Sequence, residues 1–402
     1  MKKRVIILSA ILLILILQAY AFEQNSYAAQ RLTRKQKQEL VFINAATESF
    51  NDSQYDVAID YFTKAIEVNP KNPKSYAKRG TSKYLSGDYE AAVKDYTKAI
   101  ELDPNYENIY YNRGIAKANL NEYDEVLEDY TKALELNPEN VNALLNRGTT
   151  KVLMKQYQEA VEDFTKVIEL DEKNELAYYN RGVAKRNLED YKSAIDDYTR
   201  VIELDNKNIE AYNNRGVAKY YLKDYKGAID DYSKVIDLNK NFKRAYFNRG
   251  ISRLGLNKFE DAIEDFEKEL EINPKNDMAY YQMALAQTKL SHYKNAIDSY
   301  TKAIEINPNN ADYYAQRGNL LSKTETDLEK AQNDLTKAIE LDKDDSEKYL
   351  TRAIIYCKQE HYLLAIDDLN IVIKLDEKNT HAYDLRSYAI KSLNSVEKAN
   401  KI

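Results

Sequence analysis

The stretch "AYYNRGVAK" at residues 177–185 returns almost unchanged as "AYNNRGVAK" at residues 211–219. Both copies place an amide, a guanidinium and a glycine in succession within a segment that otherwise has the pattern of a helix. A glycine in a helix interior costs about 1 kcal/mol relative to alanine, and an arginine on a packed face needs a polar partner. The return of this combination indicates a structural requirement that the chain meets repeatedly.

The glycine of this stretch recurs every 34 residues, and aromatic residues and prolines follow the same period. The recurring glycines are Gly80, Gly114, Gly148, Gly182, Gly216, Gly250 and, two periods later, Gly318. Such self-similarity is typical of repeat architectures. We predict ten units, which span 39–72, 73–106, 107–140, 141–174, 175–208, 209–242, 243–276, 277–310, 311–345 and 346–379.

Each unit has the pattern of two helices. In the unit 73–106, apolar and aromatic residues fall at helical spacing in two runs, separated by "SGDY" and closed by "LDPN". The proline cannot continue a helix, so each unit is predicted to be a helix, a tight turn, a second antiparallel helix and a short link. One such pair cannot bury both of its faces, and neighbouring pairs must therefore stack into a solenoid.

The residues at fixed places in each unit carry a family resemblance. In the third unit they are Tyr110, Gly114, Tyr123, Tyr130, Ala133 and Pro138. This pattern resembles the tetratricopeptide repeat, and the resemblance covers 39–379. It implies an all-α, right-handed superhelix of antiparallel helix pairs, whose first helices line a concave groove that holds a partner. Residues 380–402 are predicted to form a capping helix and tail, and 22–38 an N-terminal linker.

The arginine can be interpreted by comparing the units with one another. Units with an arginine at the seventh place also have an aspartate in the second helix, whereas Ala45 occurs with Tyr61 and Met283 with Ser299. We therefore predict a partly buried ion pair between the two helices of a unit. The predicted pairs are Arg79/Asp95, Arg113/Asp129, Arg147/Asp163, Arg181/Asp197, Arg215/Asp231, Arg249/Asp265, Arg317/Asp334 and Arg352/Asp368. Arg386 has no such aspartate in its own segment.

The amide next to the arginine is the candidate binding group. It lies about 100° around the helix from the arginine, on the face expected to look into the groove. These residues are Asn112, Asn146, Asn180, Asn214, Asn248, Gln282 and Gln316. A carboxamide both donates and accepts, so a ladder of them could hold a peptide backbone. The alternative is that they tie neighbouring first helices together.

Aromatic residues accompany the predicted ladder at the fifth place. They are Tyr111, Tyr179, Phe247 and Tyr281. Aromatic surfaces in a groove can clasp apolar side chains or stack on sugar rings. Packing between adjacent units is the alternative interpretation.

The N-terminus has the pattern of an export signal. "MKKR" precedes the apolar run "VIILSAILLILIL", and "AYA" at 19–21 supplies small residues for cleavage. We predict a signal peptide at 1–21, with an uncleaved anchor at 5–22 as the alternative, and hence a location in the periplasm, in the cell envelope or outside the cell. Its removal would delete three basic residues and change the net charge from −6 to −9.

The composition and the scattered histidines disfavour several function classes. An acidic chain without a stripe of basic residues is a poor candidate for binding nucleic acid. The three histidines, His292, His361 and His381, lie far apart in the sequence, so no metal site, cofactor or catalytic group is predicted. We therefore predict a non-enzymatic, exported scaffold that binds a peptide or protein segment. The alternative is a polysaccharide-binding or export accessory protein that uses the groove tyrosines.

Overall fold

The computed structural model describes residues 32–399. The predicted signal or anchor lies outside the described residues. Within 32–399 all regular secondary structure is α-helical, which confirms the predicted all-α class and its helix pairs. Contacts divide the chain into two compact units, one ending at Glu189 and the other beginning at Asp190, and each is described by itself.

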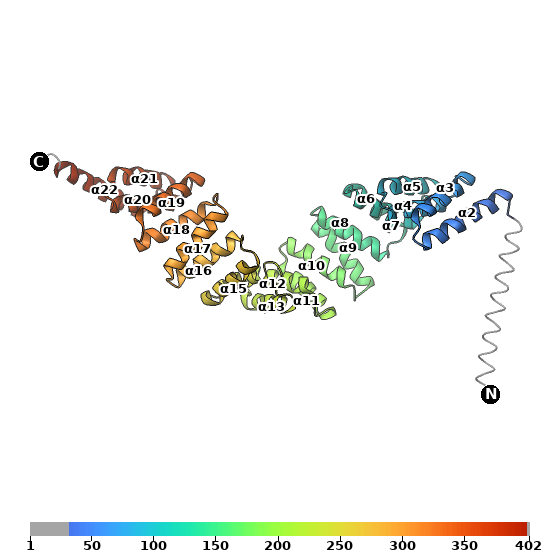
Figure 1. The fold of residues 1–402 in the computed structure, drawn as a ribbon, viewed down its shortest axis with the longest axis horizontal. Helices are drawn as coiled ribbons and strands as arrows, with labels where there is room; N and C mark the ends of the chain where they lie inside the picture. The colour runs from blue at the N-terminus through green and yellow to red at the C-terminus, as the bar shows by residue number, and fades with distance from the viewer. Residues whose placement is uncertain (1–31, 400–402) are drawn as a thin grey trace, which may run out of the picture. The chain divides into compact units, whose positions relative to one another are not determined.

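The first compact unit contains successive antiparallel helix pairs (Figure 1). Its helices are α2 (Arg34–Asn51), α3 (Tyr55–Val68), α4 (Pro73–Leu85), α5 (Tyr89–Leu102), α6 (Glu107–Asn119), α7 (Tyr123–Leu136), α8 (Val141–Leu153), α9 (Tyr157–Leu170) and α10 (Glu175–Asn187). Helix α2 begins inside the segment that the sequence assigned to a linker, because Thr33 and Gln36 form a capping box there.

The second compact unit continues the same pattern and ends on a single long helix. Its helices are α11 (Tyr191–Leu204), α12 (Ile209–Tyr221), α13 (Tyr225–Leu238), α14 (Ala245–Gly255), α15 (Phe259–Ile272), α16 (Asp277–Lys289), α17 (Tyr293–Ile306), α18 (Ala311–Thr324), α19 (Leu328–Leu341), α20 (Ser346–Lys358), α21 (Tyr362–Leu375) and α22 (Thr380–Ala399). The predicted repeat 175–208 has its first helix in one compact unit and its second helix in the other.

Asparagines at the ends of the links determine where most first helices begin. Asn208, for example, accepts a hydrogen bond from the backbone N–H of Ala211 at 2.9 Å. Phe242 occupies the corresponding place before α14 and cannot cap. Helix α14 consequently starts only at Ala245, after Arg244 in the left-handed region with φ 66°.

The recurrent glycine stands where the two helices of a repeat cross. A Cβ added to Gly80 would lie 2.8 Å from the Tyr96 ring, and one added to Gly250 would lie 2.8 Å from the Phe266 ring. Larger side chains would force the helices apart, and this explains why the helix accepts the poor propensity of glycine. The close crossing is the structural requirement that the return of the glycine every 34 residues indicates.

The turn between the two helices of a repeat uses one left-handed residue. These residues are Ser53, Gly87, Asn121, Lys155, Glu189, Lys223, Asn257, Ser291, Glu325 and Glu360. The unit 311–345 has one residue more than the others, and its first helix α18 is one residue longer than α16 before the chain reaches Glu325. None of the helices in the described part of the chain is long and apolar enough to cross a membrane.

Candidate functional site

The repeated arginine connects three helices. Arg215 on α12 donates from Nε and Nη2 to the two carboxylate oxygens of Asp231 on α13, at 3.0 and 2.6 Å. Its Nη1 donates to Oγ1 of Thr199 on α11, in the preceding repeat, at 3.1 Å. A bidentate ion pair within a repeat is thus combined with a hydrogen bond to the repeat before it.

The same three-way contact recurs in both compact units. Its further members are Thr63–Arg79–Asp95, Thr97–Arg113–Asp129, Thr131–Arg147–Asp163, Ser233–Arg249–Asp265, Thr301–Arg317–Asp334 and Thr336–Arg352–Asp368. Arg181 donates from Nη1 to Thr165 at 3.1 Å, while Asp197 belongs to the other compact unit. The hydroxyl partners were not predicted from the sequence.

Most of these aspartates receive a second cation. Lys219 Nζ lies 2.8 Å from Asp231 Oδ2, and Arg253 Nη1 lies 2.8 Å from Asp265 Oδ2. Asp265 is only 2% exposed, and this burial raises the pKa of its carboxyl against the lowering influence of Arg249 and Arg253. The arginines and aspartates therefore act as structural groups that orient the first helices.

The predicted amide ladder divides into two classes. Asn146 donates from Nδ2 to the Tyr111 hydroxyl at 3.2 Å, which ties α8 to α6, and Asn214 is buried. The remaining amides are Asn112, Asn180, Asn248, Gln282 and Gln316. Within 32–399 their carboxamides make no side-chain hydrogen bond, and all five are half-buried. Both interpretations weighed from the sequence thus have a basis in different members of the ladder.

The fifth-place aromatics Tyr111, Phe247 and Tyr281 are half-buried and pack on neighbouring rings. The Tyr111 ring centroid lies 5.8 Å from that of Tyr130, and the Phe247 centroid lies 5.9 Å from that of Phe266. Tyr281 lies 4.9 Å from Tyr313 in the following repeat. Tyr179 is half-buried on α10. Packing therefore covers part of the ring surfaces of Tyr111, Phe247 and Tyr281.

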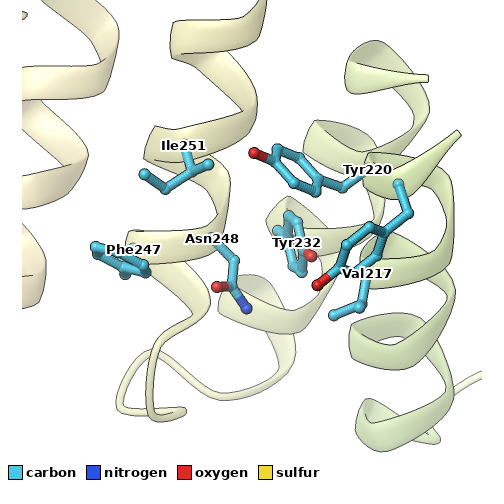
Figure 2. Close-up of a pocket in the computed structure, with 7 residues that line it drawn as sticks. Val217, Tyr220, Tyr232, Phe247, Asn248 and Ile251 are labelled. Carbon is cyan, nitrogen blue, oxygen red and sulfur yellow. The ribbon is translucent and has the colours of Figure 1, made fainter. Parts of the chain in front are cut away.

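A cleft opens between the first helices α12 and α14, with α13 at its floor (Figure 2). Its volume is about 200 Å³, and its lining residues are Val217, Tyr220, Tyr221, Tyr232, Phe247, Asn248 and Ile251. Figure 2 shows Tyr220 and Asn248 extending from opposite helices into the space between them. The Tyr220 hydroxyl has a raised pKa because burial disfavours the phenolate.

Of the residues that line this cleft, Phe247 and Asn248 were predicted from the sequence as site residues, whereas Val217 and Ile251 were not. Both missed residues stand at the ninth place of their repeats, one turn along the helix from the fifth place. Tyr221 is 58% exposed at the edge of the cleft, and its ring stacks on Tyr191 at 4.9 Å with an interplanar angle of 6°. The signal that could have found the missed residues was their helical spacing from the aromatics already chosen.

Family models match most of the chain. A model described as TPR repeat matches 80–121, and models described as tetratricopeptide repeat match 42–72, 108–140, 129–162, 176–208, 209–242, 244–276, 278–310 and 299–333. The chain belongs to the tetratricopeptide repeat family. No curated protein is significantly similar to this tetratricopeptide repeat chain in sequence.

Solved structures of other repeat proteins are similar to this chain. YrrB, described as a TPR protein with an unusual peptide-binding site, is 27% identical, with a TM-score of 0.44 over 46% of this chain and 96% of its own. MamA is 30% identical, with a TM-score of 0.41 over 42% and 92%. The C-terminal part of a TPR repeat-containing protein from Cytophaga hutchinsonii is 19% identical, with a TM-score of 0.54 over 60% and 98%, and shows the fold alone.

The described residues offer no cluster that suggests a metal centre. Among residues 32–399, no group of three or more histidine, cysteine, aspartate or glutamate side chains could hold a metal ion. The repeated aspartates of the second helices bind arginine, and several of them also bind a lysine or a second arginine. The cleft and the half-buried amides are therefore the candidate site.

Proposed function

We propose that this tetratricopeptide repeat chain is a non-enzymatic scaffold that binds an extended peptide segment of a partner protein along its first helices. The cleft between α12 and α14 is the anchor point and carries the proposal. Its volume of about 200 Å³ lies below the roughly 300–1,000 Å³ of sites for drug-sized ligands. It therefore suits a single apolar or aromatic side chain better than a cofactor.

The polar groups around the cleft support a peptide ligand. Asn248 can donate to and accept from a peptide backbone, and Tyr220 presents a ring beside it. Gln282 and Gln316 stand at the same place on α16 and α18, and their carboxamides make no side-chain hydrogen bond within the described residues. An extended chain rises about 3.3 Å per residue, and packed helices lie about 8–10 Å apart. Successive amides would then meet about every third peptide residue.

Two substitutions test the cleft. Peptides selected from a random library on the purified chain should bind at least about 10-fold more weakly to Asn248→Ala and to Tyr220→Ala, a loss of about 1.4 kcal/mol. Matched controls are Asn295→Ala on α17 and Tyr388→Ala on α22, both exposed and away from the cleft. Titration calorimetry would give the affinities. Equal affinity for all four variants would contradict the proposal, and selective binding of glycans would favour the polysaccharide alternative.

We also propose that the chain acts outside the cytoplasm, on the basis of the basic, apolar and small-residue pattern at 1–21. Expression of the full chain in a bacterial host should yield a protein in the exported fraction whose N-terminus is Phe22. An intact N-terminus in the membrane fraction would favour the anchor at 5–22. A protein that remains in the cytoplasm would contradict both forms of the proposal.

A further inference from the structure

Helix α22 has the residues of a first helix but no second helix follows it in the described chain. Tyr383, Arg386 and Ser387 stand at its fourth, seventh and eighth places, in register with the tyrosine, arginine and glycine of the complete repeats. The Arg386 guanidinium lies 5.4 Å from the Tyr383 ring centroid, and in a complete repeat Arg215 lies 5.5 Å from Tyr212. Within the described residues, α22 is therefore a first helix without a second helix.

Arg386 makes only one of the two contacts that its counterparts make. Its Nη1 donates to Oδ1 of Asn370 on α21 at 2.7 Å, which corresponds to the bond that Arg215 makes to Thr199. In complete repeats Nε and Nη2 bind an aspartate of the second helix. Within the described residues, Nε and Nη2 of Arg386 have no acceptor, so a fork of two donors stands where a carboxylate is bound elsewhere.

The surface around Arg386 has the shape that a second helix requires. Ser387 occupies the place of the crossing glycine, where only a small side chain leaves room for an aromatic ring from the partner helix. Tyr383 and Ile390 are each 42% exposed, whereas Tyr110, the counterpart of Tyr383 in a complete repeat, is 8% exposed. A cation, a small residue and two apolar side chains thus remain open together.

We propose that α22 is a docking site for an acidic amphipathic helix supplied by a partner protein, which completes the half repeat. The chain itself shows which pattern fits. In α13 the residues that pack on the first helix are Ala228, Asp231, Tyr232 and Val235, which gives alanine, aspartate, an aromatic residue and a small apolar residue at helical spacing. The aspartate of the incoming helix binds Nε and Nη2 of Arg386, and its aromatic ring packs over Ser387.

A second copy of this chain is a poor occupant for this surface. Most second helices with the required aspartate already pack on their own first helices, namely α5, α7, α9, α13, α15, α19 and α21. Helix α22 itself lacks the pattern, since its only aspartate, Asp384, follows Ala382 by two places. The site is separate from the cleft between α12 and α14 and does not depend on the proposed peptide binding there.

A peptide taken from the chain provides the probe. Residues 225–238 contain the full pattern, and a lactam between Lys226 and Asp230, both exposed and four residues apart, would hold the peptide helical. We expect it to bind the full chain saturably in fluorescence anisotropy. Asp231→Ser in the peptide and Arg386→Met in the protein should each weaken binding at least 10-fold. Combining the two changes should weaken it no further than either one alone.

Two controls separate docking from a damaged fold. Ser387→Trp should block the site while Arg386 is retained, and both protein variants should keep the circular dichroism of the parent. Library peptides that bind the α12–α14 cleft should bind these variants unchanged. Equal binding of the probe to the parent, Arg386→Met and Ser387→Trp proteins would overturn the proposal. Self-association that Arg386→Met abolishes would also overturn it, by identifying a second copy as the occupant.

Discussion

Two successive junctions between repeats are held together by different chemistry. At the junction of 209–242 with 243–276, Arg249 donates to Ser233 at 3.0 Å and forms a bidentate pair with Asp265. At the next junction, Met283 takes the place of the arginine and Glu267 that of the hydroxyl. Corresponding helices nevertheless pack in the same order at both junctions, so the ionic contacts are not required for stacking.

At the second junction, neutral side chains take the places of the charged groups, and one buried carboxylate departs from the pattern of the other repeats. Ser299 donates to Oε1 of Gln287 at 2.9 Å, and both residues are buried. Glu269, however, is 2% exposed where other repeats have alanine or valine. Its Oε1 accepts from Asn276 at 3.0 Å, while Oε2 has no partner among the described residues. The comparison shows that the polar set changes as a whole, because a single change would leave a buried group unpaired.

The largest effect is expected when one member of the ionic set is removed. Arg249→Met leaves the buried Asp265 with Arg253 alone and should lower local stability by about 3 kcal/mol. Hydrogen exchange of the amides in α13–α15 would measure this loss. The triple variant Arg249→Met/Arg253→Gln/Asp265→Ser installs the neutral set of the next repeat and should recover most of it. A triple variant as unstable as Arg249→Met would contradict the inference that these polar residues are replaced together as one set.

The second expected effect is a gain in stability. Glu269→Val removes a buried carboxylate whose Oε2 is unsatisfied, and it should stabilise α15–α16 by about 1–2 kcal/mol. Hydrogen exchange across 259–289 would measure the change. The matched control, Val235→Glu, places the same carboxylate at the preceding junction and should destabilise it. A loss of stability in Glu269→Val would show that the carboxylate is satisfied in solution.

The third effect depends on pH. Burial raises the pKa of Tyr300 to about 12, whereas an unfolded tyrosine titrates near 10. The folded state therefore holds this proton more tightly, and its contribution, complete below pH 10, is lost as the pH rises towards 12. We expect a cost of about 1 kcal/mol at pH 11. The difference in the free energy of unfolding between pH 8 and pH 11, measured with urea, should be smaller for Tyr300→Phe than for the parent protein. This substitution copies Phe266 of the preceding repeat. An unchanged difference would assign the effect to other tyrosines.

The smallest effect concerns the left-handed turn residues of the two repeats. Ser291 has φ 61° and Asn257 has φ 57°. Asparagine tolerates this region better than serine, and glycine tolerates it best. Ser291→Gly should therefore raise stability by about 0.5–1 kcal/mol and Asn257→Gly by only a few tenths, as measured by urea unfolding. A larger gain at Asn257 would contradict this order.

Much of the architecture could be predicted because the chain contains its own alignment. The joint presence of Arg249 with Asp265 and the joint absence at Met283 with Ser299 pointed to contact within a repeat. The hydroxyl partner was missed, although Glu267 and Met283 replace the hydroxyl and the arginine together at the junction of 243–276 with 277–310. A pairing of opposite charges does not reveal this partner, because a threonine carries no charge. Arg386 follows the same pattern, because Asn370 stands at the place of the hydroxyl residue in the preceding repeat and accepts its hydrogen bond.

The amide ladder was less predictable. Helical phase placed Asn146, Asn214 and Asn248 on one face, and in this sense they are equivalent in the sequence. Asn146 is bonded to Tyr111, Asn214 is buried and Asn248 lines a cleft. Their environments differ because the residue opposite each amide comes from another repeat and varies in size. Periodicity specifies a direction around a helix but not the space that remains there.

The sequence by itself determined the helix pairs, their period, the crossing glycines and the ion pairs, because each depends on residue identities at fixed spacing along one chain. Only the tertiary structure decided which amides remain available, that the arginine also binds the preceding repeat, and that two donors of Arg386 have no acceptor within residues 32–399. These properties depend on distances between side chains of neighbouring repeats. Such distances follow from packing across the junctions, where a one-residue difference in size changes what is buried.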